Sequence, residues 1–493
     1  MFRLFVRRLN FSVLAILTAA AAQACDNAAT EAAPRPTSVP AFSLTLGASA
    51  LSVAPGGTTS TSIKATRTDG LASTITYAVT GAPPGLAASI VAGASDIATL
   101  TVAASGTLAV GTYSIAVNGS APGALAQQAT VAVTVTLPTG ASPSIALVVA
   151  GNHTCALTTA GAAYCWGYNG NGQLGNNDTS YVNPTPVAVA GGLTFQTISV
   201  SKVEDISCGI TTSGAAYCWG SNRAGQLGEG TTTRHLTPTP VDGGLTFRSV
   251  AVGNGHACGV ATNGTAYCWG TTPNGAFGDG STGVHLTPTA TATGLTFQSI
   301  VAGSDYTCAL TSAGAAYCWG LGFSGQLGDG NRTNSTTPVA VSGGLTFRSL
   351  AAGGLSVCGL TSDGNAYCWG QNFYGTLGDG TTRLSGAPVA VAGGLTFQNL
   401  SAGYETMCGV TASGAGYCWG YNFGALGDGT FDHRSSPAAV VGGLKFLSIS
   451  GGTGYSCGVT TANAVYCWGD NPEGELGDGT VTPRDTPVPV RWP

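Results

Sequence analysis

The chain has 493 residues, of which 76 are glycine and 15 are cysteine, and its 17 basic and 22 acidic residues give a net charge of −5. A hydrophobic content of 43% with sparse charge excludes a disordered chain, and the lack of a basic excess excludes binding to nucleic acid through bulk charge. Abundant glycine and threonine with few helix-forming surface residues predict an all-β protein, and fifteen cysteines are more than cytosolic proteins usually carry.

The first 24 residues have the pattern of an export signal peptide. Three arginines among the first eight residues precede an apolar run from residue 11 to residue 22, which ends in a small-x-small site. Cys25 follows this site directly, where bacterial lipoproteins carry their lipidated cysteine. We predict a signal peptide at 1–24, lipidation of Cys25 and a tether at 25–40, with plain cleavage as the alternative. The protein is then extracytoplasmic, either lipid-anchored in the cell envelope or secreted.

Residues 41–137 contain five short segments of alternating apolar and polar residues, separated by clusters of glycine, proline and serine. Several strands at this spacing predict an immunoglobulin-like β-sandwich, and the segment resembles bacterial domains of that kind. It has no cysteine and no tryptophan, and none of its residues suggests chemistry. We therefore expect a spacer that holds the next domain away from the membrane.

Residues 144–493 contain seven copies of the triplet Cys-Trp-Gly, spaced by 49 to 53 residues. This period indicates a solenoid or a propeller, and seven is a common number of blades. A Gly-Leu-x-Phe strand follows six copies but not the seventh, whereas a strand-like segment at 144–149 precedes the first copy. We expect a closed seven-bladed β-propeller in which the segment 144–149 completes the last blade.

A second motif follows Tyr-Cys-Trp-Gly in these units. Gly-Gln-Leu-Gly-Glu/Asp-Gly, at 225–230 and 325–330, resembles the regulator of chromosome condensation repeat, and the resemblance covers all seven units. It implies a seven-bladed β-propeller that acts by contact with other proteins, in some members as a guanine-nucleotide exchange factor. The departures are small, such as Ala276-Phe277 in place of Gln-Leu and one residue fewer in the sixth unit.

Each repeat holds two cysteines ten residues apart, and a glycine or asparagine lies where a three-residue hairpin loop needs a left-handed backbone. The two cysteines should then face each other on neighbouring strands, so we predict disulfides; zinc and redox motifs use shorter spacings. By strand alternation the tryptophans should pack between blades rather than form a platform that stacks on sugars. The predicted disulfides are Cys155–Cys165, Cys208–Cys218, Cys258–Cys268, Cys308–Cys318, Cys358–Cys368, Cys408–Cys418 and Cys457–Cys467.

Two sets of loops differ most between the repeats, one after Trp-Gly and one before the first cysteine. If both sets open on one face, they form a ring of aromatic residues with scattered acids, which protein interfaces favour. Ordinary loop variation is the alternative. The candidate binding residues are Tyr168, Arg223, Phe323, Phe373, Tyr374, Tyr421 and Phe423 after Trp-Gly, and Asp305, Tyr306, Tyr404 and Glu405 before the first cysteine.

A further series of acids stands directly before glycine: Glu229, Asp279, Asp329, Asp379, Asp428 and Asp478. We interpret these acids as turn residues rather than calcium ligands, and we expect no metal and no cofactor. No catalytic motif is present, so the leading hypothesis is a monomeric, non-enzymatic scaffold that binds a protein or a cell-surface polymer and no nucleic acid. The alternatives are a glycan hydrolase at the mouth of the channel, guanine-nucleotide exchange by family analogy, and a structural part of the envelope.

Overall fold

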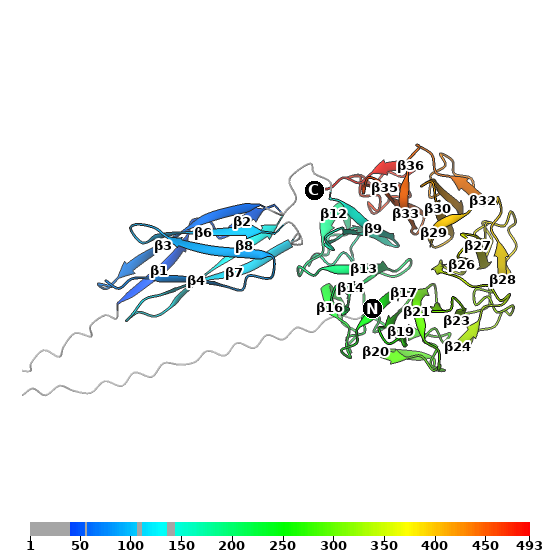
Figure 1. Cartoon of the computed structure of the whole chain (residues 1–493), viewed down its shortest axis with the longest axis horizontal. Coiled ribbons are helices and arrows are strands. Elements are labelled where there is room, and N and C mark those ends of the chain that lie inside the picture. The colour runs from blue at the N-terminus through cyan, green and yellow to red at the C-terminus, as the bar shows by residue number, and fades with distance from the viewer. Residues whose placement is uncertain (1–39, 55–56, 106–110, 136–142) are drawn as a thin grey trace, which may run out of the picture.

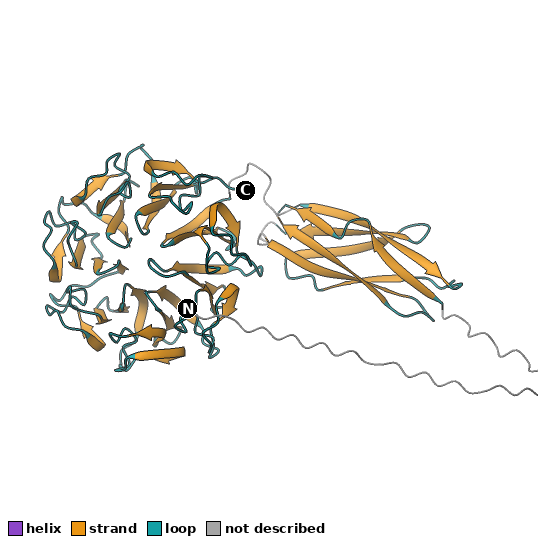
Figure 2. Cartoon of the chain, turned by 180° about the vertical axis from the view of Figure 1, so that it is seen from behind, coloured by secondary structure: helices purple, strands orange, loops and turns teal. Residues whose placement is uncertain are grey.

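The computed structural model describes residues 40–54, 57–105, 111–135 and 143–493. These residues form 36 β-strands and no helix, so an all-β fold is confirmed for this part of the chain (Figure 2). It follows that no helix in the described ranges is long and apolar enough to span a bilayer. The predicted signal peptide, Cys25 and the tether lie outside the described residues.

Two four-stranded sheets occupy residues 41–135. One has the order β1 (Ala41–Leu46), β3 (Thr58–Thr68), β6 (Ile97–Ala104), β5 (Leu86–Ala92), and the other β2 (Ala50–Val53), β8 (Gln127–Val135), β7 (Gly111–Ser120), β4 (Thr76–Thr80). Alternate residues are buried along β6 and β8, as expected when one face of each strand is turned inward. Leu100 and Val102 of the first sheet pack in one core with Val117 and Val133 of the second. This segment is therefore a two-layer β-sandwich.

Seven four-stranded antiparallel sheets follow, each with its strands side by side in chain order. The first contains β9 (Ile145–Ala150), β10 (His153–Thr158), β11 (Ala163–Tyr168) and β12 (Val182–Ala188), and the second contains β13 (Phe195–Val200), β14 (Ile206–Thr211), β15 (Ala216–Gly220) and β16 (His235–Pro240). The third contains β17 (Phe247–Val252), β18 (His256–Ala261), β19 (Ala266–Thr272) and β20 (Gly283–Ala290), and the fourth contains β21 (Phe297–Ala302), β22 (Tyr306–Thr311), β23 (Ala316–Gly320) and β24 (Ser335–Ala340).

The fifth sheet contains β25 (Ser349–Ala352), β26 (Ser356–Leu360), β27 (Ala366–Gly370) and β28 (Ser385–Ala390). The sixth contains β29 (Phe397–Ala402), β30 (Thr406–Thr411), β31 (Gly416–Gly420) and β32 (Arg434–Ala439), and the seventh contains β33 (Phe446–Gly451), β34 (Tyr455–Thr460), β35 (Val465–Gly469) and β36 (Arg484–Pro489). The sheets follow one another around a ring, which is consistent with a β-propeller (Figure 1). The first strand of every sheet lines a central cavity of about 240 Å³.

The closure of the ring differs from the sequence prediction. Strand β9 does not complete the last sheet; it pairs with β10, where Val149 lies opposite Cys155. Each Gly-Leu-x-Phe strand likewise opens the sheet of the following repeat, as β13 does with β14. The seventh repeat therefore lacks no strand, and side chains join the first and last sheets: Val148 and Trp166 pack in one core with Tyr455 and Val459.

The disulfide prediction is confirmed in all seven repeats. In each repeat the two cysteines are bonded and lie directly opposite each other on the second and third strands, with Cα–Cα distances of 4.0 to 4.1 Å. The predicted turn residues have positive φ, from 59° at Asn463 to 90° at Gly264. Because the fourteen cysteine sulfurs of the repeats are bonded in these pairs, they are not available as zinc ligands.

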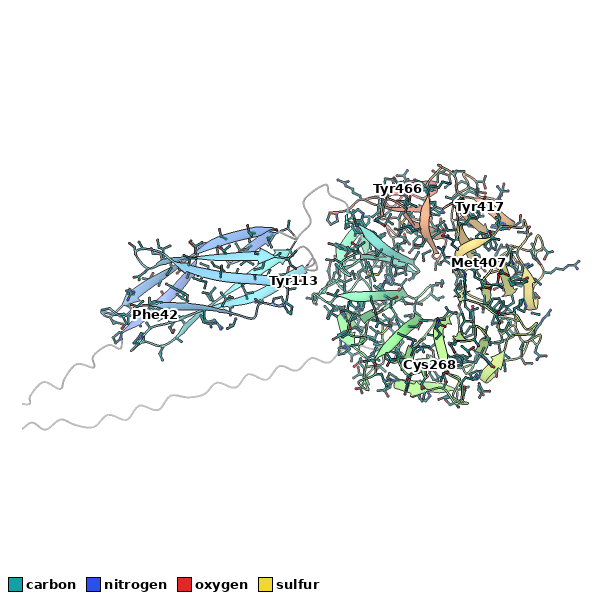
Figure 3. The ribbon with its side chains drawn as sticks, viewed as in Figure 1. Phe42, Tyr113, Cys268, Met407, Tyr417 and Tyr466 are labelled. Carbon is teal, nitrogen blue, oxygen red and sulfur yellow. A yellow bond between two sulfur atoms is a disulfide. The ribbon has the colours of Figure 1, made fainter. Side chains whose placement is uncertain are left out.

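The repeated tryptophans are fully buried between neighbouring sheets, as predicted. Trp419 packs in one core with Leu360 of the preceding sheet and with Met407, which Figure 3 labels. Each indole Nε1 donates to a backbone carbonyl of the preceding repeat; Trp219 donates to Gln173 O at 2.8 Å. Trp166 makes the same bond to Glu475 O at 2.7 Å, across the junction of the seventh and first sheets. This contact needs a glycine two residues after the carbonyl, since a Cβ at Gly477 would come within 2.7 Å of the Trp166 Nε1. The tryptophans are therefore unavailable as a sugar platform.

Candidate functional site

The two variable loop sets lie together on one face of the ring. In an antiparallel sheet the loop from the first to the second strand and the loop from the third to the fourth strand leave at the same end. Backbone hydrogen bonds join the two loops, from Ser221 N to Asp205 O at 2.8 Å and from Tyr421 N to Glu405 O at 2.9 Å. We call this end of the ring the loop face.

Three phenylalanines are exposed on the loop face. Phe323, Phe373 and Phe423 have exposed fractions of 57%, 64% and 50%. Each stands four residues after its tryptophan, so they occupy equivalent positions in three consecutive repeats. Arg223 holds the same position in the second repeat and is also exposed. Large apolar side chains that gather on an exposed surface mark interaction sites.

An aromatic cluster forms beside these phenylalanines, on the fifth and sixth sheets. The Tyr421 ring lies 4.9 Å from Tyr374, 5.1 Å from Phe423 and 5.1 Å from His433, measured between ring centroids. The His433 ring is held in place by a hydrogen bond, because the backbone N of Asn422, the residue after Tyr421, donates to His433 Nδ1 at 3.0 Å. We call Tyr374, Tyr421, Phe423 and His433 the aromatic cluster.

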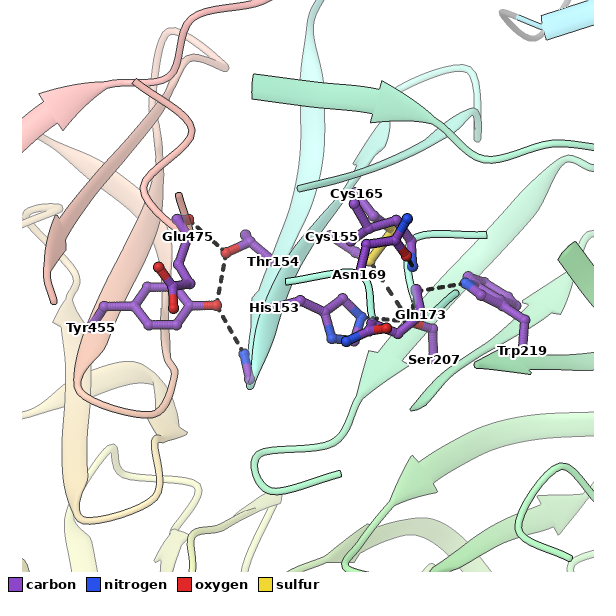
Figure 4. The surroundings of a disulfide bond; sticks show 12 residues. His153, Thr154, Cys155, Cys165, Asn169, Gln173, Ser207, Trp219, Tyr455 and Glu475 are labelled. Atoms are coloured by element: carbon purple, nitrogen blue, oxygen red, sulfur yellow. Dashed lines mark hydrogen bonds between the residues drawn. A yellow bond between two sulfur atoms is a disulfide. The ribbon is translucent and has the colours of Figure 1, made fainter. Parts of the chain in front are cut away.

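One candidate, Tyr306, is wrongly placed by the sequence analysis. Its side chain is fully buried, and its hydroxyl lies 2.9 Å from Ser356 O and 3.1 Å from Gly353 O of the next sheet. Burial raises its pKa. The position is the first residue of the second strand, whose side chain fills the space between sheets rather than the loop face. The equivalent His153 is buried in the same way, where its Nε2 contacts Ser207 Oγ at 2.6 Å and desolvation lowers its pKa to about 3 (Figure 4).

The remaining candidates lie on the loop face in two groups. Tyr168 packs edge-on against Tyr181, with ring centroids 4.8 Å apart, in the first repeat. Tyr404 is half-buried, and its carbonyl accepts a bond from Gly354 N at 2.7 Å. Tyr181 was not among the predicted residues; it stands at the end of the loop that begins after Tyr168, and a second aromatic residue in that variable loop was the available signal.

Several carboxylates of this face are half-buried without a partner. Asp305, Glu405 and Asp470 make no side-chain hydrogen bond or ion pair with any residue that the structure describes, and burial raises the pKa of all three. Glu204 also has a raised pKa, first because of burial and then because of Asp205. Asp205 differs, since Asn152 Nδ2 and Asn171 Nδ2 donate to its two oxygens at 2.8 and 2.6 Å.

Glu475 is a further buried acid, and the sequence analysis overlooked it. Burial raises its pKa to about 7. Three other repeats carry glutamine at this position, and that difference was the available signal. Its backbone carbonyl accepts bonds from both Trp166 Nε1 and Thr154 Oγ1 of the first sheet, which places Glu475 at the closing junction of the ring (Figure 4).

The acids that precede glycine act as turn residues. Asp379 Oδ1 accepts a bond from Thr381 N at 2.9 Å, and Asp428 adds an ion pair with Arg434 Nε at 2.9 Å. The described ranges hold no group of three or more His, Cys, Asp or Glu side chains arranged to bind a metal ion. These contacts favour the turn interpretation over calcium.

The central cavity is lined by the first strands of the sheets. Its lining residues include small apolar side chains, a few serines and a single charged residue, Lys202, and no carboxylate. Lys202 Nζ donates to Ala352 O of the fifth sheet at 2.8 Å, and desolvation lowers its pKa to about 8. Asp305 and Glu405, two of the candidate binding residues, are not among the lining residues.

Sequence comparisons identify relatives of this ring. The model of the RCC1-like domain matches residues 115–456, more than half of the chain, and the model of the regulator of chromosome condensation (RCC1) repeat matches residues 446–475. The probable E3 ubiquitin-protein ligase HERC4 of Homo sapiens is 37% identical over 100 residues, covering 19% of this chain and 9% of that protein. The ultraviolet-B receptor UVR8 of Arabidopsis thaliana is 30% identical over 122 residues, covering 23% and 26%. The chain thus spans about a quarter or less of these relatives.

Solved structures with the same fold include human WBSCR16, with a TM-score of 0.62, 19% identity and coverage of 67% of this chain and 94% of that one. Yeast RCC1 (Prp20), in its complex with Kap60, has a TM-score of 0.59 and 19% identity, with coverage of 72% and 89%. Prp20p from Saccharomyces cerevisiae, described with its binding to Gsp1p and histones, has a TM-score of 0.55 and 23% identity, with coverage of 62% and 80%. At these identities the likeness shows the fold alone.

Proposed function

Because this chain belongs to the family of RCC1-like domains, we propose that it is a seven-bladed β-propeller, preceded by an immunoglobulin-like spacer, whose loop face binds another protein. The seven four-stranded sheets, each with one disulfide hairpin, support the blade count. The two-layer sandwich supports the spacer, since its two sheets bury one common core.

The observation that carries the binding function is the row of exposed phenylalanines. Phe323, Phe373 and Phe423 lie in the loops from third to fourth strand, whose backbones are hydrogen-bonded to the loops from first to second strand of the same sheet, so the fold holds these side chains on the loop face. Rigid aromatic side chains on an otherwise polar face are typical anchors of protein interfaces. The yeast relative Prp20p binds proteins, which agrees with this class of function.

An extracytoplasmic location is part of the proposal. Seven disulfides in one chain are expected where thiols are oxidised, and the amino-terminal pattern favours export with a lipid on Cys25. Such a location removes the chain from cytosolic GTPases, so we do not favour the exchange activity. Labelling cells with a fatty acid tests the anchor: the label should enter the wild-type protein and be absent from Cys25→Ser, and equal labelling of both would refute it.

The binding function is tested by crosslinking in the cells that make the protein. A photo-crosslinking residue at the position of Phe373 in the full chain should yield a specific protein adduct, identified by mass spectrometry. Unlabelled wild-type protein should compete for that partner, whereas the double variant Phe373→Ala/Phe423→Ala should compete at least tenfold less well. Phe431→Ala is the matched control, since Phe431 is 60% exposed but lies later in its loop, outside the row. Equal competition by all three proteins would refute the proposed face.

A further inference from the structure

The loop that carries Tyr421, at the centre of the aromatic cluster, lies against two other loops that each carry a carboxylate: its backbone bonds that of Glu405, and a Cβ at Gly424 would come within 3.4 Å of the Cα of Gly469, the neighbour of Asp470. Glu405 lies in the preceding loop of the sixth sheet and is joined to Tyr421 by the backbone bond of 2.9 Å. Asp470 lies in the seventh sheet, where its backbone N donates to Gly454 O at 3.0 Å. Both acids act electrostatically on the Tyr421 hydroxyl: its pKa is raised first by burial, then by Tyr374, Asp470 and Glu405.

Neither flanking carboxylate has a counter-charge. Both are half-buried, and burial disfavours their charged forms, which is why their pKa values are raised. The acids before glycine behave differently, since Asp428 and Asp478 have arginine partners and lowered pKa values. A cation placed between Glu405 and Asp470 would therefore be stabilised by charges that the free protein leaves unpaired.

The surrounding charge on the loop face has one dominant sign. The part of the loop face nearest the sheets consists of each loop from first to second strand and the six residues after each Trp-Gly. This part holds seven acids and two bases. The acids are Glu204, Asp205, Asp305, Glu405, Asp470, Glu473 and Glu475, and the bases are Lys202 and Arg223. Lys202 is occupied at the central cavity by its bond to Ala352 O. This part of the face therefore attracts positive groups.

We propose that the loop face binds an arginine side chain of its protein partner, with the guanidinium against the rings of Tyr421 and Phe423 and paired with Glu405 and Asp470. This inference rests on the proposed function and names the chemistry of the partner. Arginine fits the site better than lysine, because its planar group stacks on aromatic rings while its edge bonds carboxylates. A compact ammonium can satisfy the charge but not the stacking.

The test uses the full chain and fluorescently labelled peptides in which glycine alternates with arginine, lysine, citrulline or glutamate. Fluorescence anisotropy should show the tightest binding for the arginine peptide, at least about threefold weaker binding for lysine, and no binding for citrulline or glutamate. The double variant Glu405→Gln/Asp470→Asn should weaken the arginine complex at least about tenfold.

The matched control is Asp242→Asn/Asp363→Asn, which makes the same change in charge. Both residues are exposed and lie in loops at the opposite end of the ring. The control should change affinity less than twofold; equal weakening by the two double variants, or equal affinity for arginine and lysine peptides, would overturn the proposal. If the acid variant keeps wild-type competition for the crosslinked partner while Phe373→Ala/Phe423→Ala loses it, the proposed function stands and the arginine site is refuted.

Discussion

Glu475 stands where glutamine stands in three other repeats, and this difference has a measurable consequence. Gln173, Gln226 and Gln326 each accept a bond through Oε1 from the backbone N two residues earlier, and Glu475 Oε2 accepts the same bond from Glu473 N at 3.0 Å. The Glu475 side chain is only 8% exposed. A neutral amide keeps this bond without a buried charge, as in Gln173 and Gln326, whose Nε2 atoms are nevertheless buried without a partner among the described residues. Glu475→Gln should therefore stabilise the fold when the carboxyl would otherwise be ionised, because the cost of a buried charge exceeds that of a neutral amide N–H without a partner.

The sign and size of the effect follow from the raised pKa. Glu475 has a pKa of about 7 in the folded protein against 4.5 ordinarily, so the folded state binds more protons between these values. The free energy of unfolding therefore falls as pH rises from 4.5 to 7, and the loss is complete above pH 7. At about 1.4 kcal/mol per pH unit, the loss amounts to about 3 kcal/mol as an upper limit.

The assay is guanidinium unfolding of the oxidised full chain at pH 4.5 and pH 8, followed by tryptophan fluorescence, which reports the buried indoles of the ring. Glu475→Gln should match the wild type within about 0.5 kcal/mol at pH 4.5 and exceed it by about 2–3 kcal/mol at pH 8. Glu473→Gln, two residues away and more exposed, is the control and should show no such pH dependence. An equal effect of Glu475→Gln at both pH values would show that ionisation of this carboxyl is not its cause.

Three further outcomes are expected. Gly328→Ala should lower the free energy of unfolding by at least about 2 kcal/mol more than Gly330→Ala in the same assay. Both glycines have positive φ, but only at Gly328 would the new Cβ meet a buried indole, at 2.7 Å. Equal losses would contradict the packing argument. Cys308→Ser/Cys318→Ser should lose about 2–3 kcal/mol, and a thiol titration of the unreduced wild type that finds fourteen free thiols would refute the disulfides. Tyr306→Phe removes a buried, hydrogen-bonded hydroxyl, so it should lower the free energy of unfolding by about 1–3 kcal/mol yet leave partner binding unchanged. A loss of binding with stability intact would show that Tyr306 belongs to the binding site.

Local features of the fold were predictable from the sequence. The ten-residue spacing of the cysteines and the glycine in each turn depend on only a dozen neighbouring residues, and a hairpin's register follows from its turn. The burial of Trp166 and its equivalents followed from strand alternation for the same reason. The loop sets that share one face were also predictable once the hairpin register was known, and exposed Phe373 and Phe423 lie where they were expected.

Other features depended on contacts between distant segments. The residue pattern of β9 fits pairing in the first sheet or in the last sheet equally well, and only the structure places this strand beside β10 of the first sheet. Tyr306 and Tyr421 look alike as loop aromatics, but Tyr306 is buried between sheets whereas Tyr421 is half-buried in a cluster of rings on the loop face. The raised pKa values of Glu405 and Glu475 likewise arise from burial by neighbouring loops. The sequence by itself determined each hairpin, its disulfide and the family, because geometry within a few neighbouring residues controls them. Tertiary structure decided the closure of the ring and the charge of its loop face, since both depend on which side chains of different repeats exclude water from one another.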